Sequence, residues 1–160
     1  LGISRGELMD YVLQKSSELV VSCITPVFTE HCEVKLDPGR IGKRMSHWQQ
    51  VIISACEQSG RSHVPRLQQP VALASWLNAS GMPVKLVFDH QQGQSLSCLA
   101  PGQAIALLTG PEGGLSAAEL EQAREAGFQG IRLGPRVMRT ETAPVAALAV
   151  LQYLRGDFQL

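Results

Sequence analysis

Arg139, Thr140, Glu141 and Thr142 place a cation, a carboxylate and two hydroxyls side by side between apolar stretches of the chain. A carboxylate can accept a proton in general base catalysis, and a guanidinium can stabilise an anion that develops during a reaction. Helix capping by Thr140 or Thr142 would account for one residue, but not for Arg139 and Glu141 together. We predict Arg139 and Glu141 as catalytic residues, and the alternative is a plain ion pair that fixes the loop.

The segment Thr109–Gly114, with the sequence TGPEGG, is the second candidate for chemistry. It follows an expected buried strand over 104–108 and precedes an expected helix, which Ser116 and Glu119 would open with a capping box. Glycines let a ligand approach the backbone, and ligands of open α/β sheets bind beyond the carboxyl ends of strands. Neither a dinucleotide fingerprint nor a phosphate loop is present. The segment is either a ligand loop or a glycine-rich strand-to-helix turn.

A third segment, Leu133-Gly134-Pro135-Arg136, leaves an expected strand over 130–133 and by itself favours a structural turn. Hydrophobic periodicity and turn residues predict the elements that position these loops. Helices are expected over 4–20, 42–58, 71–79, 116–127 and 142–154, and strands over 23–28, 31–35, 84–88, 104–108 and 130–133. Ser4 with Glu7 predicts a capping box for the first helix, and Pro38-Gly39 a turn. The alternation predicts an α/β fold with a mainly parallel sheet flanked by helices.

Composition bears on whether the protein could be a membrane protein, a metal-binding protein or a nucleic-acid-binding protein. Apolar residues make up 44% of the 160 residues, enough for the core of one domain, and no stretch is long enough to cross a membrane. The four cysteines lack zinc-site spacing, so we expect no metal and a reduced, cytoplasmic protein. The net charge is zero. Nucleic-acid binding would therefore need local patches, for which the clusters Arg40, Lys43, Arg44 and Arg61, Arg66 are candidates beside the alternative of ordinary solvated charges.

The three loops, GPEGG, LGPR and RTETA in this order, resemble the carboxy-terminal signature of the ribosomal RNA small subunit methyltransferase E family. That family belongs to the SPOUT class of knotted methyltransferases. The earlier segments YVLQKSSELVV, ITPVFTE and ISACEQSGRSHVPRL are similar to the same family in the same order. The resemblance covers nearly the whole chain, and the combination of loops is far more specific than any single one.

The resemblance implies methylation of N3 of one uridine in 16S rRNA of the small ribosomal subunit, with S-adenosylmethionine (SAM) as the cofactor. It implies a homodimer and a deep carboxy-terminal trefoil knot. Glu141 would accept the N3 proton, Arg139 would stabilise the uracil anion, and Gln58 and Arg61 would contact the RNA or the target base. The residues expected to line the SAM pocket are Leu86, Phe88, Thr109, Gly110, Gly113, Leu133, Gly134, Met138, Thr140 and Ala143.

The family normally carries an amino-terminal PUA-like RNA-binding domain, whereas Ser4 here already begins the helix that follows the linker. We therefore expect residues 1–160 to form a single catalytic domain without that module. Three other functions compete with this one. Another SPOUT enzyme, such as a tRNA ribose methyltransferase, is disfavoured by RTETA and EQSGR, and a nucleotide-binding oxidoreductase by its missing fingerprint. A non-catalytic RNA-binding or dimerisation module would differ by not binding SAM.

Overall fold

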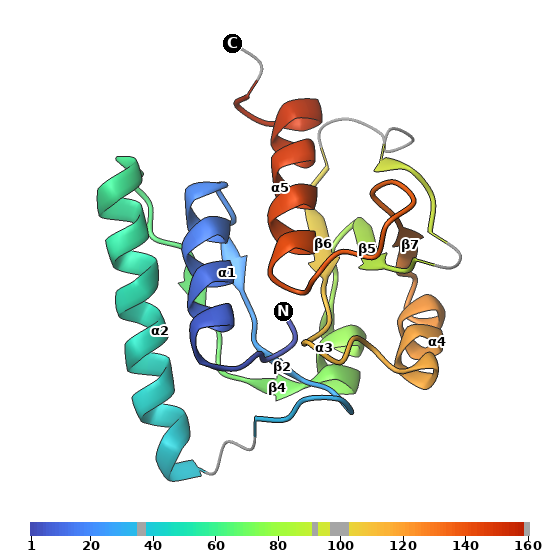
Figure 1. The fold of residues 1–160 in the computed structure, drawn as a ribbon, viewed down its shortest axis with the longest axis horizontal. Coiled ribbons are helices and arrows are strands. Elements are labelled where there is room, and N and C mark those ends of the chain that lie inside the picture. The colour runs from blue at the N-terminus through green and yellow to red at the C-terminus, as the bar shows by residue number, and fades with distance from the viewer. Residues whose placement is uncertain (35–37, 91–92, 97–102, 159–160) are drawn as a thin grey trace.

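The structure is a computed structural model that describes residues 1–34, 38–90, 93–96 and 103–158 (Figure 1). Its helices are α1 (Gly6–Glu18), α2 (Pro38–Ser59), α3 (Leu73–Ala79), α4 (Ala117–Glu125) and α5 (Thr142–Arg155). Its strands are β1 (Cys23–Ile24), β2 (Val27–Phe28), β3 (Arg66–Leu67), β4 (Val71–Ala72), β5 (Val84–Phe88), β6 (Ile105–Leu108) and β7 (Gln129–Ile131).

All strand pairs are parallel, which confirms the predicted α/β class. The main sheet has the order β6-β5-β7, with Leu86 of β5 opposite both Leu107 and Gln129. Two small sheets, β1-β3 and β2-β4, lie in the amino-terminal half. The expected strand over 23–28 is broken at Pro26, which lacks the N–H group that a ladder requires, so its two halves pair with different partners.

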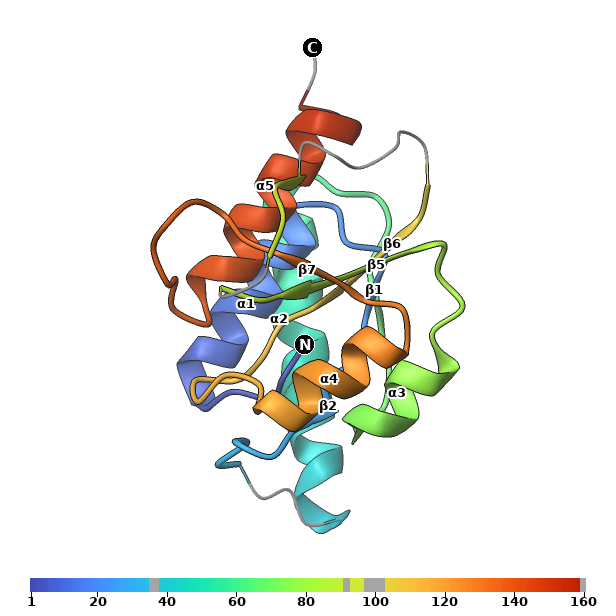
Figure 2. The ribbon, with the colours of Figure 1, turned by 90° about the vertical axis from the view of Figure 1, so that its right-hand side faces the viewer.

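Helices cover both faces of the main sheet, as the continuously apolar strands predicted. Leu86 packs with Ala147 and Leu151 of α5 on one face. Its neighbour Val87 packs on the other face, in a cluster that includes Leu77 of α3 and residues of α4. A separate core joins α1 to α2, and Figures 1 and 2 show these two helices beside α5. Both faces of the main sheet are thereby covered, and the loops lie at its carboxyl ends.

The start of α1 differs from the prediction. Ser4 is buried and forms no capping box, because the helix begins at Gly6 with Arg5 as its N-cap. No side chain of α1 caps it, and the Arg5 N–H donates instead to Oε1 of Glu112, at 2.8 Å. Tyr11 is exposed, whereas its neighbour Val12 is buried. The pattern of apolar residues located the helix but not the exact face that it buries.

Other helices and strands have bounds that differ from the predicted ones. Residues 31–34 form no strand, and Lys35 lies outside the described residues. The expected turn at 38–39 is the first turn of α2, where a proline is tolerated. Residues 61–69, for which we expected no helix or strand, contain β3, and the helix expected from residue 71 begins later because β4 pairs with β2.

The predicted capping box of α4 is confirmed. Ser116 and Glu119 form both hydrogen bonds of the capping box at the start of α4. Gly60 and Gly127 follow the helix ends with positive φ angles. Pro144 lies in the first turn of α5. Within the described ranges, no helix is long and apolar enough to cross a membrane, and no group of His, Cys, Asp or Glu could hold a metal ion.

Candidate functional site

A cavity of about 450 Å³ lies where the three strands of the main sheet end. Phe88 ends β5 and Ile131 ends β7, residues 109–115 follow β6, and residues 132–140 follow β7; these segments form most of its wall. His90, Leu120 and Ala143 complete the lining. This is the edge at which open α/β sheets bind ligands, and the volume lies in the range of small-molecule sites.

The structure brings together nearly all of the residues expected to hold the cofactor. Phe88, Thr109, Gly110, Gly113, Leu133, Gly134, Met138, Thr140 and Ala143 line the cavity. Leu86 does not, because it lies in the middle of β5, where α5 covers that face of the sheet. Only the last residue of β5, Phe88, reaches the open edge.

The glycines of the first loop are required by the folding of the loop itself. A Cβ atom on Gly110 would lie 2.9 Å from the Gly114 carbonyl carbon and from the Leu115 amide nitrogen. Gly114 has a φ angle of 70°, which side chains of L residues rarely permit. A Cβ atom on Gly113 would lie 2.7 Å from the Cβ of His31. The loop therefore folds back tightly on itself and against the amino-terminal half.

Hydrogen bonds connect the loop over residues 109–114 to the amino-terminal half of the chain. The Gly2 N–H donates to the Thr109 carbonyl at 2.7 Å, and the His31 ring Nδ1 bonds the Gly113 carbonyl at 2.9 Å. Glu112, whose role the sequence did not suggest, accepts from Arg5 at the start of α1, where a carboxylate is favourable because of the helix dipole. The sequence carried no signal for this contact, because Ser4 and Glu7 suggested a capping box within the helix itself.

The RTETA loop is tied directly to the first loop. The Thr140 hydroxyl donates to the Gly110 carbonyl at 2.6 Å. This bond takes the place of the expected helix cap, since the N-cap of α5 is Glu141 and no side chain caps it. The Arg139 carbonyl accepts from the N–H groups of Thr142 and Ala143, which closes the turn into α5. The hydrogen bond therefore joins two walls of the cavity that are formed by segments separated in sequence.

Arg139 and Glu141 are not an ion pair. Arg139 is exposed and lines the cavity, whereas Glu141 is half-buried beside it in sequence and does not line it. In the part of the chain that the structure describes, neither side chain forms a hydrogen bond or an ion pair. The structural alternative for this pair therefore fails, and Arg139 is free to reach a bound molecule.

Gln58 and Arg61 lie away from the cavity. The Arg61 guanidinium donates to the carbonyls of Ser17, at 2.8 Å, and Val21, at 2.6 Å, and so caps the end of α1. Gln58 is exposed near the end of α2. Figure 1 shows α1 and α5 between α2 and the loop after β7. The structure gives Arg61 a role in packing.

The cavity has charged neighbours that the sequence did not single out. Arg132 and Arg136 line it beside Arg139. Asp89, directly after β5, is buried and pairs with Arg124 of α4 at 2.6 Å. Hydrogen bonds to Asp89 and to Glu121 raise the pKa of Arg124. This pair anchors the chain beyond Phe88 to α4.

Residues 1–152 match the family described as the RNA methyltransferase domain. The chain belongs to this family. This RNA methyltransferase domain is 38% identical over 97% of its length to the ribosomal RNA small subunit methyltransferase E of Buchnera aphidicola subsp. Schizaphis graminum, and covers 64% of that protein. It is 32% identical over 98% of its length to the protein of the same name from Bacillus subtilis, covering 66%.

Solved structures place the domain in the same group. A Legionella pneumophila protein in complex with bound SAM matches with a TM-score of 0.95 and 44% identity over 98% of this chain and 65% of that one. A ribosomal RNA small subunit methyltransferase E of Neisseria gonorrhoeae bound to SAM matches with a TM-score of 0.91 and 45% identity over 99% and 65%. The chain thus spans slightly less than two thirds of the length of these relatives.

Proposed function

We propose that this RNA methyltransferase domain transfers a methyl group from SAM to N3 of a uridine in bacterial 16S rRNA. One observation carries the proposal: the three loops singled out in the sequence meet around one cavity, joined by the bond from Thr140 to Gly110. The names of the relatives and the SAM bound in two similar structures support it.

The lining of the cavity fits SAM. Gly110, Gly113 and Gly134 present backbone without side chains, as close approach of an adenosyl or methionyl group requires. Phe88, Leu133 and Met138 add apolar and polarisable surface beside them. When bound, SAM supplies an electrophilic methyl group. The residues of this chain would hold it in place, since orientation of the reacting atoms contributes much of the acceleration in such transfers.

The acceptor needs both access and loss of a proton. N3 of uracil lies on the pairing edge, so the base must be unpaired or flipped out of its stack before it reaches the cavity. Arg139 at the cavity wall would stabilise the negative charge that develops on a uracil carbonyl oxygen. Glu141, which lies between the lining residues Thr140 and Ala143 in sequence and has no partner in the described structure, would accept the proton.

We further propose that the protein forms a homodimer through α5. A helix that is apolar on all sides is typical of a buried element, yet Val145, Leu148 and Val150 of α5 are only partly buried and Tyr153 is 61% exposed. Light scattering of the purified chain tests the dimer. The resemblance to the SPOUT class also leads us to propose a carboxy-terminal trefoil knot and a cytoplasmic location.

Deletion of the gene, followed by primer extension on 16S rRNA, tests the activity. Methylation at N3 blocks base pairing, so reverse transcriptase stops at the modified uridine. We expect one stop to disappear in the deletion strain and to return with the wild-type gene, but not with Arg139→Ala. A stop pattern identical to that of the parent strain would refute the proposed activity. Failure of the purified chain to bind SAM would favour the non-catalytic module.

A further inference from the structure

The mouth of the cavity carries a concentration of positive charge in a chain that is neutral overall. Arg132, Arg136 and Arg139 all line the cavity, and all three side chains are exposed. None of them has a hydrogen-bond or ion-pair partner in the described structure. The described lining contains one carboxylate, that of Glu112, so with His90 neutral its side chains carry two more positive than negative charges.

The backbone between Arg132, whose N–H donates to the Gln94 carbonyl, and Arg139, whose carbonyl accepts from Thr142 and Ala143, has few partners. We call residues 132–139 the arginine loop. Between Leu133 and Met138, none of its N–H groups donates to an acceptor in the described part of the chain. Val137 is 74% exposed. Figure 2 shows the loop between β7 and α5 projecting from the body of the molecule. Free donors, free cations and an exposed apolar side chain on a projecting loop are the features of a docking surface.

We propose that the arginine loop binds the sugar–phosphate backbone of the RNA strand that carries the target nucleotide, with Arg132 and Arg136 contacting the flanking phosphates. The proposal rests on the proposed function. A base that leaves its stack to enter the cavity draws its two neighbouring phosphates across the mouth. Guanidinium groups match phosphate geometry with two parallel hydrogen bonds.

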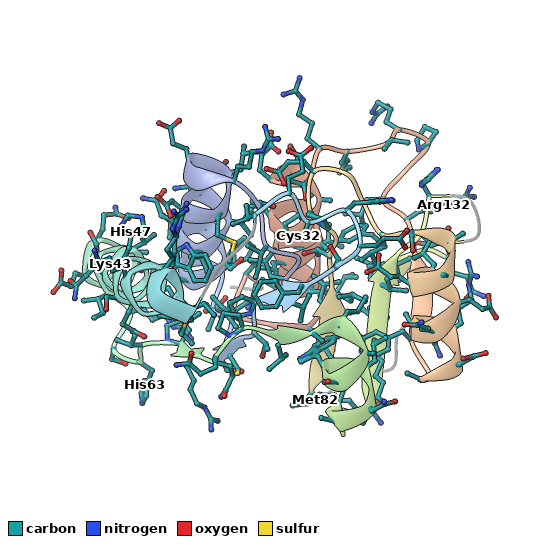
Figure 3. The ribbon with its side chains drawn as sticks, turned by 90° about the horizontal axis from the view of Figure 1, so that it is seen from below. Cys32, Lys43, His47, His63, Met82 and Arg132 are labelled. Carbon is teal, nitrogen blue, oxygen red and sulfur yellow. The ribbon has the colours of Figure 1, made fainter. Side chains whose placement is uncertain are left out.

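A second basic cluster offers a matched control. Lys43 and Arg44 lie on α2, and neither has a partner in the described structure. Figure 3 shows Lys43 and Arg132 at opposite ends of the molecule. The double variant K43Q/R44Q removes the same charge as R132Q/R136Q, but far from the cavity. A difference between these variants therefore reports position and not net charge.

The experiment measures the affinity of the purified chain for a short, fluorescently labelled single-stranded RNA containing uridines, over a range of salt concentrations. Each phosphate contact on single strands contributes about 0.7 to the slope of log K against log salt, so R132Q/R136Q should reduce the slope by about 1.4. K43Q/R44Q should keep the wild-type slope. Calorimetric titration of each protein with SAM accompanies the measurement.

An unchanged slope in R132Q/R136Q would overturn the proposal, and so would the absence of salt-dependent RNA binding by the wild-type chain. Equal reductions in both double variants would also overturn it, because the effect would then follow net charge alone. If R132Q/R136Q weakened SAM binding but not RNA binding, the arginines would belong to the cofactor site instead. Failure of the wild-type chain to bind SAM would count against the proposed function. This outcome is measured by calorimetry and is independent of the salt dependence of RNA binding.

Discussion

The bond between the Thr140 hydroxyl and the Gly110 carbonyl, 2.6 Å long, joins two walls of the cavity. Thr140→Val removes only the hydroxyl and keeps a β-branched side chain of similar shape. Net contributions of such hydrogen bonds are about 0.5–1.5 kcal/mol. Thr140 is only partly buried, so water can replace the lost donor and the cost should stay within that range. If the two walls must be joined to bind SAM, the affinity should fall about two- to tenfold.

Calorimetric titration with SAM measures this change, and Thr140→Ser is the control because it retains a hydroxyl donor. We expect Thr140→Ser to bind SAM much more like the wild type than Thr140→Val does. Thermal unfolding of both variants shows whether the whole fold has been weakened. Equal SAM affinity in Thr140→Val and wild type would refute the reasoning. An equal loss in both variants would also contradict the reasoning, because Thr140→Ser keeps the hydroxyl donor that Thr140→Val lacks.

Three further substitutions test the site and its support. Gly110→Ala should weaken SAM binding in calorimetry, since the added Cβ would meet backbone atoms of Gly114 and Leu115, and overpacking costs about 1–3 kcal/mol; unaltered affinity would remove the loop from the pocket. Arg139→Ala should abolish methylation of 16S rRNA with only a small change in SAM affinity, and normal turnover would exclude Arg139 from catalysis. Ser116→Ala should lower the free energy of unfolding by about 1 kcal/mol in urea denaturation, because it removes the α4 cap; an unchanged midpoint would contradict the role of the capping box.

The position of the site could be predicted from sequence because it depends on chain order and sheet geometry. In a parallel sheet all strands end at the same edge, so the loops after β5, β6 and β7 must meet there. The capping box of α4 could be predicted for a different reason, since its two residues lie within one helical turn. Neither inference requires knowledge of contacts between distant segments.

The remaining features depend on such contacts. Glu112 supports α1 from the other half of the chain, and Arg61 caps the end of α1 across two elements. Neither interaction leaves a periodic or local signal. Leu86 and Phe88 lie on the same side of β5. Only the position of α5 decides that Leu86 is covered and that Phe88 lines the cavity. The sequence likewise could not show that the Arg132 guanidinium has no partner in the described structure, because this depends on its neighbours in space.

Calorimetric titration of the purified wild-type chain with SAM tests most directly whether the cavity at the carboxyl ends of the main sheet is a cofactor site. We expect saturable binding that Gly110→Ala weakens strongly. A titration that shows only heats of dilution would contradict the cofactor site. Saturable binding with the same affinity in wild type and Gly110→Ala would contradict its placement at the loop that Gly110 begins.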